Sequence, residues 1–332
     1  MSGTNSRKTA LSGLMGLGAT AGCIAGVLSL AQSAQATLIH EYSFNTATIN
    51  ASSGAYTTPD SIGGASYAAT IMGTGAVSGG QVDLSNNNVQ SGAAGLAYVS
   101  LPLSALPTTS PTVSFEQWFA ASYDYQSGTS GVVYPWNRAM DFNNDTLATS
   151  SDAEAVSPKG TSGEYLYTAL DNGGGGSRTA MTGGGYTAES GVTDYTDGWL
   201  TKPSSTGAPV THMIAVVIDQ TATTAAPDGT ITYYIDGVAK GSANLTSANE
   251  WTAIAPTFTN AWLGRSAFGT DGVFNGTMDE FRIYNNALSA NQVAADFAAG
   301  PNTVLTPEPA SLAMIGLAGA SLLLMRRRRA AV

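Results

Sequence analysis

The sequence has few charged residues and almost no cysteine. Only 11% of its 332 residues are Asp, Glu, Lys or Arg, against about 25% in an ordinary globular protein. Such a shortage excludes a coiled coil or a helix bundle, whose exposed faces need those residues. Since 43% of the residues are nonetheless apolar and 39 are glycine, the composition favours a turn-rich, all-β protein with a core of its own.

The net charge of −10 conceals an uneven distribution, because six of the 13 basic residues lie at the two ends of the chain. The segment from Thr37 to Thr306 has seven basic and 22 acidic residues, which gives it a net charge of −15. Phosphate contacts need patches of lysine and arginine. We therefore expect no nucleic-acid partner.

The first 36 residues are typical of a secretory signal peptide. Arg7 and Lys8 precede an apolar run, and Ala34 and Ala36 place small residues at the −3 and −1 positions of a cleavage site. Glycine and serine within the run disfavour the alternative, a permanent membrane anchor. Cleavage by signal peptidase after Ala36 removes Cys23, so we expect the mature protein to have no disulfide, thiol nucleophile or cysteine metal site.

The last 26 residues, 307–332, combine three features in a fixed order. Pro307, Glu308 and Pro309 precede an apolar stretch, 310–325, that is slightly short of a ~30 Å bilayer core. Four arginines, which the positive-inside rule keeps cytoplasmic, follow it: Arg326, Arg327, Arg328 and Arg329. The arrangement resembles the PEP-CTERM sorting signal of Gram-negative bacteria.

That resemblance implies a transient stay in the inner membrane through a helix at 310–325. It further implies removal of the tail by an exosortase-type protease and delivery to the cell surface or the extracellular space. An ordinary C-terminal membrane anchor is the alternative. Residues 302–306 would then link the tail to the folded domain.

The body, residues 37–301, has the pattern of an antiparallel β-protein. Residues 39–44 and 113–119 alternate apolar and polar, and 213–218 form an apolar run that suits a strand buried on both faces. Asp236-Gly237 after a strand at 231–235 predicts a two-residue hairpin. We expect a two-sheet antiparallel jelly-roll sandwich.

Two regions of the body depart from the strand pattern. Ser289 and Gln292 form a capping box for one short helix that Gly300 ends, and we expect this helix at the rim of the sandwich. The stretch 120–206 is rich in Gly, Ser, Asp and Tyr and is typical of long loops at one end of a sandwich, where binding usually occurs.

Four segments together carry a family resemblance: 42–45 (YSFN), 60–64 (DSIGG), 234–237 (YIDG) and above all 274–284 (FNGTMDEFRIY). The body resembles a LamG-like (laminin G/concanavalin A-like) jelly-roll domain over about residues 38–300, most weakly in 120–206. The resemblance implies two curved antiparallel sheets and a role in binding glycans or proteins. It does not imply an enzyme.

Asp279 is a candidate metal ligand. Alternation along the strand predicts Asp279 on the same face as Phe281 and Ile283, where a bare carboxylate would cost several kcal/mol. A structural Ca²⁺ would stabilise it, and LamG-like domains often carry such an ion. The alternative is that Asp279 accepts backbone hydrogen bonds or pairs with an arginine or histidine.

Candidate ligand-binding residues lie mainly in the variable stretch. Aromatic rings stack on sugar faces and planar polar groups hydrogen-bond to hydroxyls, which singles out Tyr123, Tyr125, Tyr134, Trp136, Asn137 and Trp199. The alternative is that these rings only pin long loops to the core, since aromatics bury large areas wherever they lie.

Catalysis has little support in the sequence. Glucanases of similar fold align carboxylates as E-x-D-x-x-E or E-x-D-x-E on one strand face, and the chain has neither spacing. Asp279 and Glu280 are adjacent, so alternation points them to opposite faces. The predicted function is therefore an exported, non-catalytic binding or adhesion protein of the cell surface or matrix, with an extracellular polysaccharide or a surface protein as partner. The alternatives are a carbohydrate-active enzyme (glycoside hydrolase or polysaccharide lyase) and a purely structural surface component.

Overall fold

The computed structural model describes residues 37–49, 55–86, 89–122, 136–144, 165–171, 176–182, 189–194, 209–221 and 223–304. The expected signal peptide and the expected tail, with its apolar stretch at 310–325, lie outside these residues. Among the helices formed by the described residues, none has the length and apolar character needed to cross a membrane.

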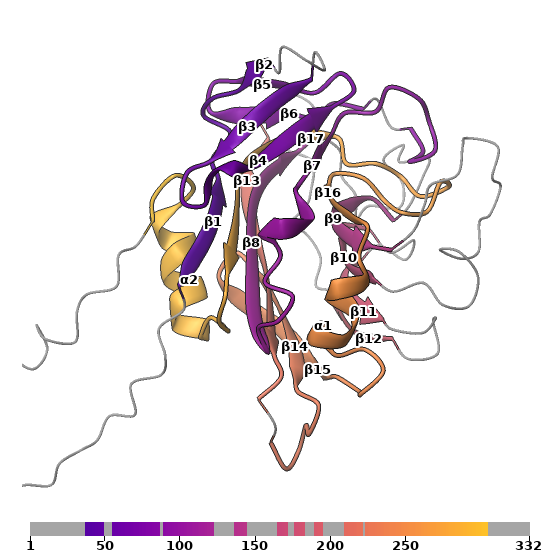
Figure 1. Cartoon of the computed structure of the whole chain (residues 1–332), viewed down its shortest axis with the longest axis vertical. Helices are drawn as coiled ribbons and strands as arrows, with labels where there is room; N and C mark the ends of the chain where they lie inside the picture. Colours follow the sequence, from indigo (N-terminus) through magenta and orange to yellow (C-terminus); the bar gives the residue numbers. More distant parts are fainter. Residues whose placement is uncertain are drawn as a thin grey trace, which may run out of the picture. The chain divides into compact units, whose positions relative to one another are not determined.

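One sheet has eight strands and includes the apolar run at 213–218. Figure 1 shows its strands beside those of the second sheet. Its strands, in spatial order, are β15 (Val238–Asn244), β14 (Thr230–Ile235), β13 (Thr211–Asp219), β8 (Thr112–Ala121), β17 (Gly276–Tyr284), β6 (Gln81–Asp83) and β5 (Ala76–Ser78), with β1 (Leu38–Tyr42) also paired to β17. The hairpin predicted at Asp236-Gly237 joins β14 to β15, and both residues have positive φ, 48° and 77°.

The second sheet has nine strands. In spatial order they are β12 (Ser190–Asp194), β11 (Ser177–Thr182), β10 (Tyr165–Ala169), β9 (Arg138–Asn143), β16 (Asn260–Leu263), β7 (Tyr98–Ser100), β4 (Gly64–Met72), β3 (Tyr56–Asp60) and β2 (Thr48–Ile49). Every ladder between these strands and within the first sheet is antiparallel. The predicted antiparallel two-sheet sandwich is confirmed.

The main core lies between the two sheets. Phe115 of β8 is at its centre, with ring centroids 5.2 Å from Phe142 of β9 and 6.2 Å from Phe281 of β17. All three rings are at most 1% exposed. Because β8 and β17 belong to one sheet and β9 to the other, this aromatic cluster joins the two layers, as the inner faces of a sandwich require.

A second apolar cluster covers the outer face of the eight-stranded sheet. The helix α2 (Ala290–Ala299) contributes Val293, which packs with Leu288 and with Trp118 and Met213 of the sheet. The prediction that this helix lies at the rim was wrong: it covers a sheet face, and it explains why β8 and β13 are buried on both sides (Figure 1). The predicted capping box at Ser289 is present.

The other helical segments within the described residues are short. They are a 3₁₀ turn at Leu103–Ala105, the single-turn α1 (Trp251–Ile254) and a second 3₁₀ turn, Ala255–Thr257, which continues from α1. Trp251 is fully buried and its indole nitrogen donates to the carbonyl of Pro107 at 3.1 Å. This contact ties α1 to the segment that enters β8.

Candidate functional site

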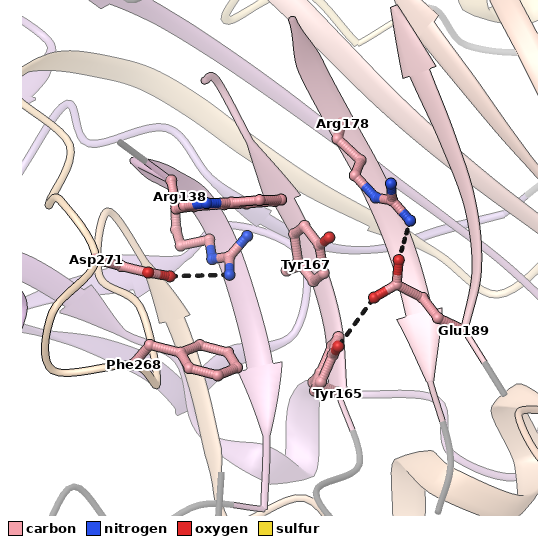
Figure 2. Close-up of a pocket in the computed structure, with 8 residues that line it drawn as sticks. Arg138, Tyr165, Tyr167, Arg178, Glu189, Phe268 and Asp271 are labelled. Atoms are coloured by element: carbon pink, nitrogen blue, oxygen red, sulfur yellow. Dashed lines mark hydrogen bonds and ion pairs between the residues drawn. The ribbon is translucent and has the colours of Figure 1, made fainter. Parts of the chain in front are cut away.

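A pocket of about 370 Å³ lies where β9, β10 and β11 run side by side, on the face of the nine-stranded sheet that points away from the sandwich core. Figure 2 shows the side chains that surround it. Aromatic and charged residues line it in equal number: Trp136, Arg138, Tyr165, Tyr167, Arg178, Glu189, Phe268 and Asp271. Such a mixture of rings and a few polar groups is typical of small-ligand sites.

Strand geometry explains how these side chains meet. Along β10 the period of two sends Leu166 into the main core and Tyr165 and Tyr167 to the outer face. In β9 the register slips by one residue, because Thr168 pairs with Met140 but Ala169 pairs with Arg138. This bulge turns Arg138 out toward the tyrosines, as bulges beside functional sites often do.

Arg138 is almost fully buried and surrounded by rings. Its guanidinium carbon lies 3.8 Å from the ring centroid of Tyr167, 5.3 Å from that of Trp136 and 5.7 Å from that of Phe268. These distances are those of cation–π contacts, which strengthen when the cation is desolvated. Arg138 thus fills an aromatic cage at the base of the pocket.

Carboxylates neutralise Arg138. Its Nη2 donates to Asp271 Oδ2 at 2.9 Å, and its Nε lies 3.6 Å from Asp141 Oδ2. Burial raises the pKa of Asp141 to about 6 and raises that of Asp271, while Arg138 opposes both shifts. The Nη1 of Arg138 has no hydrogen-bond partner among the described residues, so one donor at the pocket base is unsatisfied.

A second ion pair lies across the pocket. Arg178 of β11 contacts Glu189 through Nη2 and Oε1, and the hydroxyl of Tyr165 donates to Glu189 Oε2 at 3.0 Å. Figure 2 shows this pair and the Arg138–Asp271 pair on opposite sides of Tyr167. The Arg178 side chain is 28% exposed and that of Arg138 only 4%, so Arg178 is the more accessible cation.

Trp136 forms part of the pocket wall and has an unusual backbone. Its φ is +64°, which a bulky residue adopts only at a cost of order 1–3 kcal/mol. The indole packs edge-on against Tyr167, with centroids 6.4 Å apart. Backbone strain of this kind concentrates at ligand-binding sites.

Residues 93–294 match the family model described as the concanavalin A-like lectin/glucanases superfamily. The chain belongs to this superfamily. The match includes every residue that lines the pocket.

Solved structures with a similar arrangement are distant in sequence. Domain 4 of AbnA, an extracellular arabinanase from Geobacillus stearothermophilus solved with arabinotriose, is 18% identical, with 79% of this chain and 98% of that chain covered and a TM-score of 0.45. The sialidase carbohydrate-binding module CBM40 of Ruminococcus gnavus, bound to α2,6-sialyllactose, is 14% identical, with 68% and 92% covered and a TM-score of 0.40. A botulinum neurotoxin D/C binding domain is 11% identical, with 79% and 51% covered and a TM-score of 0.46. No curated protein matches this superfamily member.

Of the predicted ligand-binding residues, the structure brings one to the pocket. Trp136 lines it, whereas Asn137 is buried and its carbonyl accepts the amide of Leu170 at 2.8 Å. The other four lie outside the described residues: Tyr123, Tyr125, Tyr134 and Trp199. Two pocket residues that were not predicted, Tyr165 and Tyr167, could have been found from the sequence. The motif Tyr-Leu-Tyr on a strand puts two aromatic rings on the same face of the sheet.

Asp279 lies elsewhere, and its predicted face was wrong. β17 has a bulge at Asp279, since Met278 pairs with Phe119 and Glu280 with Trp118. Met278 therefore joins the main core with Phe281. Asp279 instead accepts from Gln81 Nε2 at 2.6 Å, and its Oδ2 has no partner among the described residues.

A calcium site at Asp279 stays a prediction. Burial raises the pKa of the Asp279 carboxyl, and the Gln81 hydrogen bond opposes the shift. The described residues contain no group of three or more His, Cys, Asp or Glu side chains placed to hold a metal ion. The amide nitrogen of Gln81, which donates to Asp279 Oδ1, is not a calcium ligand.

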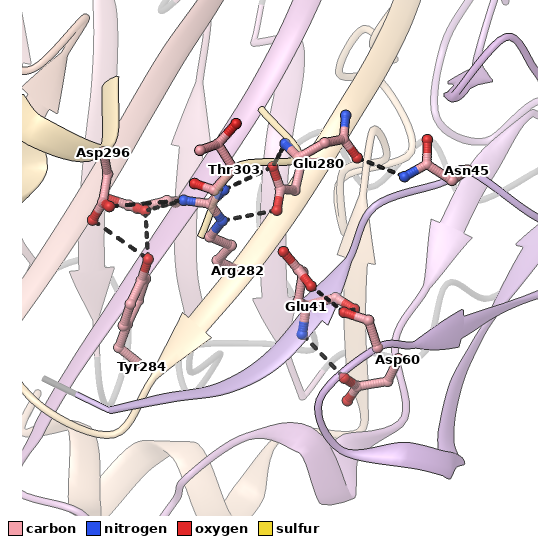
Figure 3. A network of polar contacts seen from close by, with 11 residues as sticks. Glu41, Asn45, Asp60, Glu280, Arg282, Tyr284, Asp296 and Thr303 are labelled. Atoms are coloured by element: carbon pink, nitrogen blue, oxygen red, sulfur yellow. Dashed lines mark hydrogen bonds and ion pairs between the residues drawn. The ribbon is translucent and has the colours of Figure 1, made fainter. Parts of the chain in front are cut away.

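Arg282 of β17 forms the centre of a second polar cluster, on the outer face of the eight-stranded sheet (Figure 3). It holds Glu280 by two hydrogen bonds, at 2.8 and 3.1 Å, and its guanidinium carbon lies 4.4 Å from the ring centroid of Trp118. Glu116 and Asp296 lie 3.8 and 3.9 Å from Nη1. Three carboxyls thus surround one arginine that is 0% exposed.

The same cluster holds the chain after α2. Arg282 Nη2 donates to the carbonyl of Thr303 at 3.0 Å, and the amide of Asn302 donates to Glu280 Oε2 at 2.5 Å. The side chain of Asn302 also accepts from Asn45 Nδ2 at 2.7 Å. Residues 302–303 are therefore bound back onto β17, and we call these contacts the clasp.

Proposed function

We propose that the chain is an exported, non-catalytic saccharide-binding protein of the cell surface or extracellular matrix, and that it binds its ligand in the β9–β11 pocket. The observation that carries the proposal is the pocket itself. Trp136 and Phe268 offer half-buried rings to sugar faces, while Arg178 and Glu189 offer groups that hydrogen-bond to hydroxyls. Its volume of about 370 Å³ falls within the 300–1,000 Å³ of small-ligand sites.

Export rests on the sequence features of the two ends. The expected cleavage after Ala36 and the PEP-CTERM resemblance of 307–332 support export of the mature domain. Signal peptidase and an exosortase-type protease are the processing partners that these features imply. The acidic body suits an extracellular role, since a net charge far from zero favours solubility.

The test is binding by the purified full-length chain, kept in a detergent without a sugar head group, to a panel of soluble oligosaccharides. We expect one class to bind saturably and Trp136→Ala to raise its Kd about thirtyfold, the effect of losing a contact worth about 2 kcal/mol. Tyr56→Ala is the matched control, because Tyr56 is 43% exposed on β3 of the same sheet. Equal affinities of the two variants, or no binding at all, would contradict the proposal and favour a structural surface component.

A carbohydrate-active enzyme is the second candidate. The observation in its favour is that two carboxyls, Glu189 and Asp271, line one pocket, and burial raises the pKa of Asp271 as a general acid requires. Each carboxyl is held by an arginine, which favours binding over catalysis. Chromatography of the bound oligosaccharide separates the two: an unchanged chain length supports binding, and shortening that Asp271→Asn abolishes would establish the enzyme.

A further inference from the structure

Both arginines of the pocket already have carboxylate partners. Arg138 contacts Asp271 and Asp141, and Arg178 contacts Glu189. The four charged residues that line the pocket sum to zero, and Asp141 beneath them adds a negative charge. Each positive charge at the pocket is therefore neutralised by a carboxylate, and the donor left without a partner is the buried Nη1 of Arg138.

The surroundings add to this effect. Residues 37–306 carry a net charge of −15, so the field at the surface repels anions. An acidic sugar would have to approach against this field and then either compete with Glu189 for Arg178 or reach the buried Nη1 of Arg138, whose charge Asp271 and Asp141 already neutralise. A carboxylate transferred into the pocket without a free cation would lose its hydration without compensation.

Uncharged hydroxyls meet no such obstacle. Both oxygens of Glu189 already accept one hydrogen bond each, from Arg178 and from Tyr165, and each keeps a second lone pair for a sugar hydroxyl. Asp271, which also lines the pocket, accepts from Arg138 and from Ser266 through Oδ2, so these two bonds do not use Oδ1. Hydrogen bonds from hydroxyls to ionised acceptors are among the stronger ones.

We infer that the pocket selects uncharged saccharides over acidic ones, and that Glu189 sets this selectivity by neutralising Arg178; the inference rests on the proposed function. Glu189 has this role because Arg178 is the more exposed of the two arginines. Without the charge of Glu189, Arg178 becomes available to pair with a uronate carboxylate.

The experiment measures Kd by calorimetry for two matched probe sets, neutral arabino-, xylo- and galacto-oligosaccharides and their acidic counterparts built from glucuronate and galacturonate. We expect the wild-type chain to bind a neutral probe at least tenfold more tightly than any acidic one. Glu189→Gln keeps the shape and one of the two hydrogen-bond acceptors but removes the charge. It should shift the ratio of the acidic to the neutral Kd at least tenfold toward acidic probes, and added salt should weaken the new binding.

Asp194→Asn is the matched control. Asp194 lies on β12, outside the residues that line the pocket, and pairs with Lys240 at 3.2 Å. Its substitution changes the net charge of the chain by the same amount and should leave the ratio unchanged. Wild-type binding of acidic probes as tightly as neutral ones, or an unchanged ratio in Glu189→Gln, would overturn the inference while the proposed function stands. Binding of neither set would overturn both.

Discussion

Removal of Arg282 should destabilise the protein in a strongly pH-dependent way. In Arg282→Gln the carboxyls of Glu116, Glu280 and Asp296 lose their shared cation inside the protein. Breaking a buried ion pair from one side costs about 3–5 kcal/mol, because the remaining charge is left uncompensated. We expect a loss of about 4 kcal/mol in the free energy of unfolding at pH 8.

The sign of the pH dependence follows from the pKa values. Burial raises the pKa of Glu280 from 4.5 to about 7, and it also raises those of Glu116 and Asp296. Between about pH 4.5 and 7 the folded state therefore holds more protons than the unfolded state, and stability falls as the pH rises. For Glu280 the shift corresponds to roughly 3 kcal/mol. Loss of Arg282 raises these pKa values further and steepens the fall.

At pH 5 Glu280, whose pKa is raised to about 7, is protonated in the folded variant, and the raised pKa values of Glu116 and Asp296 favour their neutral forms in the same direction. At pH 5 the substitution should therefore lower the free energy of unfolding by only about 2 kcal/mol, because it removes the hydrogen bonds of Arg282 and its contact with Trp118. The assay is urea unfolding followed by tryptophan fluorescence at pH 5 and pH 8. Arg265→Gln is the control: Arg265 also stacks on two rings, at 4.7 and 4.9 Å, and has no ion pair among the described residues. Equal losses at the two pH values in Arg282→Gln would refute the reasoning.

Three further outcomes are expected. Ser289→Ala should lower the free energy of unfolding by about 1 kcal/mol, because the α2 cap is lost, and Ser289→Thr should restore most of it; an unchanged melting temperature in Ser289→Ala would contradict this. Phe281→Ala, which opens a cavity between the sheets, should cost about 3–5 kcal/mol in urea unfolding, whereas Phe297→Ala, at a side chain 37% exposed, should cost far less. If Asp279 binds calcium, Ca²⁺ should raise the melting temperature of the wild-type chain and not that of Asp279→Asn; no shift in either would refute the calcium site.

Local signals in the sequence were enough for most of the fold. The continuous apolar run at 213–218 lies in β13, Asp236-Gly237 forms the predicted hairpin turn, and Ser289 caps α2 as predicted. Each of these depends on residues within a few positions of one another. The place of α2 could not be predicted in this way, because it depends on apolar residues that β8 and β13 expose on their outer face.

Bulges explain most of what the sequence could not predict about the site. One extra residue at Ala139 turns Arg138 into the pocket, and one at Asp279 puts Met278 into the core. Both bulges interrupt the alternation by which a sequence predicts the sheet face of each side chain. Neither bulge is marked by a characteristic residue composition. Phe268 and Asp271 reach the pocket from more than 120 residues beyond Trp136, a proximity that only the sheet order creates.

The clasp also has a mechanical consequence. Asn302 and Thr303 are bonded back to Glu280 and Arg282, so the chain from β17 through α2 forms a closed loop. Tension applied to the chain beyond Thr303 passes through these bonds directly into β17, which is held by β8 on one side and by β1 and β6 on the other. Because α2 lies inside this closed loop, the clasp must break before tension reaches the helix.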